Sequence, residues 1–100
     1  MSIFLITPFE MMKHLASQVQ ERRLFLNYSQ KTLAERSGVS YGVLKKFERT
    51  GQISLESLLK IALILGKLEK FKDLFATGPL ENITSLDQLL EQKKRKRGTK

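Results

Sequence analysis

Two short segments that meet at one glycine constrain the fold of this chain most. Ser29 can cap a helix that ends at Gly38, where a left-handed turn would strain any residue with a β-carbon. Ser40 then caps a second helix, which we expect to run to about Arg49. Two short helices joined by about three or four residues that include a glycine are typical of a helix-turn-helix. The spacing therefore predicts this motif over residues 29–49.

A longer helix is expected before this motif, from Pro8 to about Leu26. Thr7 supplies a capping hydroxyl, and Pro8 pre-sets the first helical dihedral. The apolar residues of the segment keep steps of three and four, and Arg23 fills a gap in their stripe. An arginine on the core side of a helix needs a partner. The apolar stripe consists of Phe9, Met12, Ala16, Val19 and Leu26.

Three further helices are expected after the motif. One starts after Ser54, is apolar on nearly every side up to Gly66 and should lie at the centre of the core. A short fifth, amphipathic helix carries Leu68, Phe71, Leu74 and Phe75 and ends before Gly78-Pro79. Thr84 with Asp87 resembles the capping signal of a last helix. That last helix would carry Leu86, Leu89 and Leu90.

The pattern predicts an all-α fold in one domain. We divide the chain into a leader (1–7), a five-helix domain (8–78), a C-terminal helix region (79–92) and a basic, disordered tail (93–100). Within the leader, Ile3 to Ile6 is either packed on the core or an arm that pairs with a symmetry mate.

The net charge of +8 is concentrated at the end of the chain. Six of the 18 basic residues and none of the 10 acidic ones follow residue 92, so residues 1–92 keep a net charge of only +2. A basic balance favours polyanions as partners, namely nucleic acid or an anionic membrane surface. The tail would either contact phosphates or stay solvated, because like charges repel and keep a run extended. The tail residues that would contact phosphates are Lys93, Lys94, Arg95, Lys96 and Arg97.

Composition argues against catalysis and metal binding. The chain has no cysteine and a single histidine, His14, so a cysteine zinc site, a disulfide, a thiolate nucleophile and a histidine cluster are excluded. The carboxylates are dispersed. The opening MSIFLIT has no cationic segment and is too short for a signal peptide or a spanning helix. We expect a cytoplasmic protein that is not an enzyme and has no cofactor, no metal and no membrane partner.

The segment after Ser40 divides into two faces when its residues are placed at 100° intervals. One face is basic and carries no large apolar group, so this helix can enter a DNA major groove, where lysine donates to guanine and glycine allows close approach. Tyr41 flanks that face at the amino-terminal end, which usually meets base edges. The inner face holds Val43, Leu44, Phe47 and Glu48, and the outer face holds Gly42, Lys45, Lys46 and Arg49.

The stretch RRLFLNYSQKTLAERSGVSYGVLKKFERTG (residues 22–51), followed by ISLESLLKIALILG, resembles the Cro and lambda-repressor-like helix-turn-helix family of the xenobiotic-response-element type. The phrases FERTG, SLESLL, LGKLEKFKDLF and SLDQLLEQ are most similar to the HipB-type antitoxins, which accompany HipA-type kinases. The resemblance implies a lambda-repressor-like domain in which Gln30, Ser40 and Arg49 contact phosphates. It also implies base or groove contacts from Tyr41, Gly42, Lys45 and Lys46, and an internal ion pair between Arg23 and Glu48.

This resemblance favours a sequence-specific transcriptional repressor that acts as a homodimer on an inverted-repeat DNA operator and autoregulates a toxin-antitoxin operon with a HipA-type kinase. One alternative is a protein-interaction antitoxin or scaffold that mainly holds a partner protein. Another is a stand-alone phage or bacterial transcription regulator. The dimer follows from an excess of apolar residues late in the chain, part of which should meet a twofold mate. These are Leu63, Ile64, Leu68, Phe71, Phe75, Leu86, Leu89 and Leu90.

Overall fold

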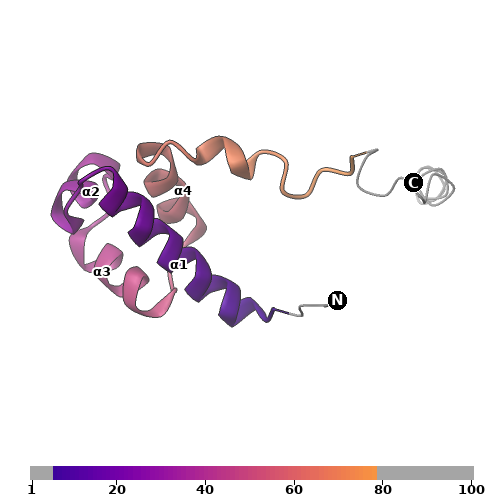
Figure 1. Ribbon diagram of the computed structural model, residues 1–100, viewed down its shortest axis with the longest axis horizontal. Coiled ribbons are helices and arrows are strands. Elements are labelled where there is room, and N and C mark those ends of the chain that lie inside the picture. The colour runs from indigo at the N-terminus through magenta and orange to yellow at the C-terminus, as the bar shows by residue number, and fades with distance from the viewer. Residues whose placement is uncertain (1–5, 79–100) are drawn as a thin grey trace, which may run out of the picture.

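The computed structural model describes residues 6–78, and within this range the fold is all-α, as expected. Figure 1 shows α1 as the longest helix, with α2, α3 and α4 packed beside it. The elements are α1 (Pro8–Phe25), α2 (Gln30–Ser37), α3 (Tyr41–Thr50), α4 (Leu55–Ile64) and the short 3-10 helix η1 (Leu68–Phe71). The predictions for Ile3 to Leu5, for the last helix with Leu86, Leu89 and Leu90, and for the tail 93–100 lie outside the described residues.

Each of the four α-helices begins at a hydroxyl cap that the sequence predicts. The cap oxygen accepts a hydrogen bond from a backbone N–H of the first turn, which would otherwise lack a partner. At Thr7 the bond is reciprocal, because the Glu10 carboxylate accepts from the Thr7 N–H at 3.0 Å. The caps and their donors are Thr7 with Glu10, Ser29 with Thr32, Ser40 with Val43, and Ser54 with Ser57.

Two glycines fix how the chain turns around α3. Gly38 has a φ of 79° between α2 and α3, and Gly51 has a φ of 85° after α3; both are left-handed conformations that favour glycine. Gly51 also lies directly against α1. A β-carbon there would come within 2.9 Å of the Met12 carbonyl carbon. The end of α3 is therefore packed on the backbone of α1 with no room for a side chain.

The core forms where α1, α2, α3 and α4 meet. Its largest fully buried side chains are Leu33, Leu44, Phe47 and Ile61. α4 is less central than its apolar sequence predicts, because it packs from one side: Ile61 is fully buried, but Leu55 and Leu63 stay exposed.

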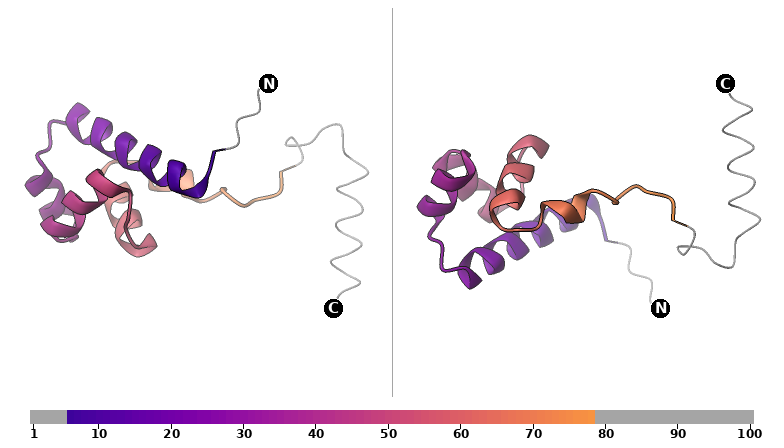
Figure 2. Two further views of the ribbon diagram at one scale, coloured as in Figure 1. Left: turned by 90° about the horizontal axis from the view of Figure 1, so that it is seen from below. Right: turned by 90° about the horizontal axis from the view of Figure 1, so that it is seen from above.

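The predicted fifth helix forms only in part. The chain forms only the 3-10 turn η1, followed by turn residues 72–75, so the part of the chain described has four α-helices. Figure 2 shows that the chain beyond η1 runs away from the four α-helices. Leu74 and Phe75 consequently remain exposed. A short amphipathic helix depends on burial of its apolar face, and here that face meets too little of the domain.

Phe9 also departs from the prediction, because it is exposed instead of lying on the core stripe of α1. The packing of α3 against α1 reaches Met12 through Gly51. Phe9 lies almost one turn before that contact, where α1 extends past its neighbours (Figure 1).

Candidate nucleic-acid interface

α3 presents a basic surface to solvent while its other side is embedded in the core. Leu44 and Phe47 are buried at 0% and 1% exposure. The residues predicted for the outer face, together with the flanking tyrosine, are all exposed. They are Tyr41, Gly42, Lys45, Lys46 and Arg49, which we call the α3 face.

Val43 is not on the inner side as expected, but is 40% exposed. The contact of α3 with the core is centred on Leu44 and Phe47, and Val43 precedes Leu44 by a rotation of 100°. This rotation places Val43 at the margin of the buried surface. The exposed side of α3 therefore includes an apolar side chain beside its basic ones.

An ion pair holds α3 to the end of α1. Arg23 Nε donates to Glu48 Oε2 at 2.8 Å, and a second guanidinium nitrogen of Arg23 donates to Glu48 Oε1 at 2.9 Å. The two side chains are only 8% and 5% exposed. Arg23 also donates to the carbonyl of Tyr28 at 3.0 Å, and the Gln30 amide donates to Glu48 Oε1 at 2.9 Å. These bonds join α1, the loop after it, the start of α2 and α3, so they set the orientation of the helix that carries the α3 face.

The same network determines the charge that α3 displays. Glu48 is the one acidic residue within α3, and its carboxylate is consumed by Arg23 and Gln30 inside the domain. The exposed charges of α3 are therefore all positive. Such a surface attracts polyanions and carries no acidic group that would repel phosphates.

Tyr41 connects this helix to α2 through its ring. The ammonium of Lys45 lies 5.0 Å from the ring centroid, and that of Lys31 lies 5.9 Å from it. Both distances are within the range of cation–π attraction. Lys31 thus extends the basic surface from the α3 face onto α2, which the sequence pattern alone does not predict. The signal that was available is its position directly after Gln30, in the first turn of α2.

Ser40 and Gln30, the two predicted phosphate ligands outside α3, differ in their exposure and in the hydrogen bonds that they already make. Ser40 is exposed, and its oxygen accepts from the Val43 N–H at 3.1 Å, which leaves the hydroxyl proton for an outside acceptor. Gln30 is half-buried and already uses one amide N–H on Glu48. Gln30 is thus an anchor of the buried network, with one further N–H to donate.

Within residues 6–78, His, Asp and Glu side chains do not gather in any group of three that could hold a metal ion. None of the described helices has the length and apolar character needed to cross a bilayer.

The chain matches a known protein family. The model of a family described as helix-turn-helix matches residues 19–70, a range that contains α2, α3, α4 and the network around Glu48. No curated protein and no solved structure matches the chain.

Proposed function

Because the chain belongs to the helix-turn-helix family of Cro/C1-type DNA-binding transcription regulators, we propose that it is a sequence-specific repressor that reads double-stranded DNA with the α3 face. The observation that carries the proposal is the electrostatics of α3. Its single carboxylate is paired inside the domain, and the side that faces solvent displays Lys45, Lys46 and Arg49. We further propose that the protein acts in the cytoplasm, where it would meet its operator.

The α3 face supplies the kinds of contact that a major groove can take. Lysine side chains donate to the N7 and O6 acceptors of guanine, and Gly42 lets the helix backbone approach the bases because a side chain is absent there. The exposed Val43 and the ring of Tyr41 add apolar surface of the kind that contacts thymine methyl groups. With two lysines and few other hydrogen-bonding side chains, part of the specificity would come from DNA shape.

Phosphate contacts would fix the register of the domain on the duplex. Ser40 and Arg49 border the α3 face, and Lys31 extends it onto α2. The free N–H of Gln30 would reach a phosphate only at the entrance of α2, because the other N–H of this amide is held by Glu48. Such contacts carry affinity and salt dependence more than sequence information.

The proposed binding is tested by footprinting the full chain on the DNA upstream of its own gene. We expect a protected segment that persists in excess random-sequence duplex. A chain that binds the upstream DNA and random duplex with the same affinity would contradict a sequence-specific function.

We propose further that the protein binds as a homodimer. A single short reading helix makes few base contacts, and a twofold dimer would place two α3 helices about 34 Å apart on an inverted repeat. The exposed Leu63 of α4 is available for association. Sedimentation of the chain with and without operator DNA tests this. Two chains on a symmetric footprint are expected, and one chain on a single asymmetric half-site would contradict it.

The finer assignment to a toxin-antitoxin operon rests on the resemblance to HipB-type antitoxins. It predicts that the neighbouring reading frame encodes a HipA-type kinase and that this kinase co-purifies with the protein. Operator binding without any such neighbour would favour a stand-alone regulator instead.

A further inference from the structure

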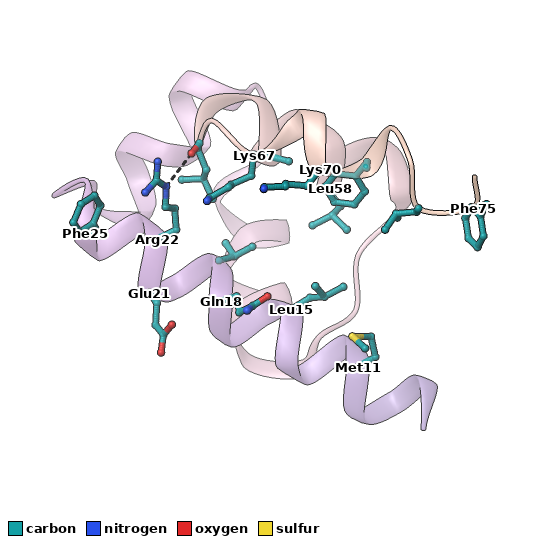
Figure 3. Close-up of a pocket in the computed structure, with 15 residues that line it drawn as sticks. Met11, Leu15, Gln18, Glu21, Arg22, Phe25, Leu58, Lys67, Lys70 and Phe75 are labelled. Atoms are coloured by element: carbon teal, nitrogen blue, oxygen red, sulfur yellow. Dashed lines mark hydrogen bonds between the residues drawn. The ribbon is translucent and has the colours of Figure 1, made fainter. Parts of the chain in front are cut away.

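A groove lined mainly by apolar side chains runs between α1 and the segment formed by α4, η1 and the turn after it (Figure 3). Its volume is about 1040 Å³, and no residue of α2 or α3 lines it. Leu15, Val19 and Leu58 contribute to its walls, and Phe25 and Phe75 are exposed beside it at 72% and 96%. We call this feature the α1–α4 groove. A groove of this kind, so rich in exposed aromatic surface, is suited to an amphipathic helix.

The charges around the α1–α4 groove are unevenly placed. Arg22, Lys67 and Lys70 are gathered on the side nearer to α4 and η1, whereas Glu21 points away from that side (Figure 3). Arg22 is fixed there, because its Nε donates to the carbonyl of Leu65 at 3.0 Å. The groove thus combines apolar walls with one cationic edge. Its occupant should carry an apolar stripe with acidic residues along one flank.

The chain itself contains a segment with this pattern. Residues 79–92 hold three acidic residues and no lysine or arginine, which contrasts with the basic tail that follows. On a helix, Leu86, Leu89 and Leu90 share one side. At 100° per residue, Asp87 borders that side, and Glu91 lies about 40° further round, away from the leucines. The Asp87 carboxylate, next to the apolar surface, is opposite in charge to the cationic edge of the groove.

The length of the chain permits this segment to reach the groove. Phe75 already lines the groove, and eight residues separate it from Thr84. Eight residues span at most about 26–29 Å, which is about the length of the whole 18-residue α1. Gly78 and Pro79 fall within this connection and are suited to a reversal of direction.

We propose that residues 84–92 dock as an amphipathic helix in the α1–α4 groove of the same chain. The three leucines would lie on the apolar walls, with Asp87 toward Arg22, Lys67 and Lys70. A second copy of the domain that placed its own groove there would instead bring two cationic edges together. Charge complementarity therefore favours the acidic segment as the occupant.

The absence of cysteine from the natural sequence allows a direct test. A nitroxide attached to the full-length Gln92→Cys variant should broaden the amide NMR signals of Leu15 and Val19 much more than those of Lys46 and Arg49. A mixture of spin-labelled chains with isotope-labelled, cysteine-free chains distinguishes a segment that docks on its own chain from one that docks on a second copy. Broadening that occurs only within one chain supports the proposal. Broadening in the mixture would overturn it by placing the segment of a second copy in the groove, and no selective broadening of groove signals would overturn it as well.

Charge variants test the proposed orientation. Asp87→Lys should lower the ratio of docked to free segment by about five-fold or less, the range expected for one surface ion pair. Gln88→Lys adds a positive charge on the side of the segment away from the leucines and should leave the broadening unchanged. Combining Asp87→Lys with Lys67→Glu and Lys70→Glu should restore the broadening in part. Equal losses for Asp87→Lys and Gln88→Lys would contradict this orientation.

Discussion

Arg23 of α1 and Glu48 of α3 form a two-pronged ion pair inside the domain, with nitrogen–oxygen distances of 2.8 and 2.9 Å. The pair also receives Gln30 and holds the carbonyl of Tyr28. One buried cluster therefore sets the position of α3 against α1 and the start of α2. It also removes the only carboxylate of α3 from the surface that would meet DNA.

Removing one partner of this pair should be much more harmful than removing both. Arg23→Met leaves the Glu48 carboxylate buried and uncompensated, and we expect the free energy of unfolding to fall by about 3–5 kcal/mol. The double variant Arg23→Met/Glu48→Leu should recover much of that loss, because apolar side chains of similar volume replace both charges. Urea denaturation measures both effects. Small and equal losses in the single and double variants would show that the pair is not effectively buried.

Two glycines with similar backbone angles should differ in their tolerance of alanine. Gly38→Ala adds only the cost of a left-handed alanine, about 1–2 kcal/mol, because no atom lies within 4 Å of the new β-carbon. Gly51→Ala adds the same cost and a collision with Met12, worth about 1–3 kcal/mol more. Thermal or urea denaturation of the two variants provides the comparison. If Gly51→Ala were no less stable than Gly38→Ala, the close approach of α3 to α1 would be contradicted.

The variant Lys31→Ala tests whether the DNA-binding surface extends from α3 onto α2. We expect Lys31→Ala to weaken binding to operator and random duplex by the same factor, because a phosphate contact carries no sequence information. The slope of log affinity against log salt should become shallower by about 0.9. Lys60→Ala on α4 is a suitable control, since Lys60 is paired with Glu56 at 3.4 Å. An unchanged salt slope for Lys31→Ala would remove Lys31 from the interface.

The features that could be predicted from the sequence are those with a local cause. The four hydroxyl caps and the glycine turn at Gly38 follow from hydrogen bonds and backbone angles within a few residues. Arg23 lies in the apolar stripe of α1, so the sequence predicts that its charge has a partner in the core. The resemblance to a known family then indicated Glu48.

The features that were missed depend on packing between distant segments. The fifth α-helix was expected from the spacing of its apolar residues, but the described domain offers it little to pack against. A helical wheel places Val43 inward because it does not show where the neighbouring helices end, and Val43 is in fact exposed. Lys31 meets Tyr41 only because α2 crosses α3 at that point.

The central claim is that the α3 face reads DNA, and the affinity of Lys46→Glu for the footprinted duplex tests it most directly. Lys72→Glu makes the same charge change at an exposed lysine after η1 and serves as the matched control. Lys46→Glu should lose specific binding while unfolding like the wild type. The lost contact alone costs about 1–3 kcal/mol, before repulsion between the new carboxylate and the phosphates is added. Lys72→Glu should bind the operator nearly as the natural protein does. A folded Lys46→Glu protein that protects the operator as the natural protein does would contradict the assignment of the α3 face.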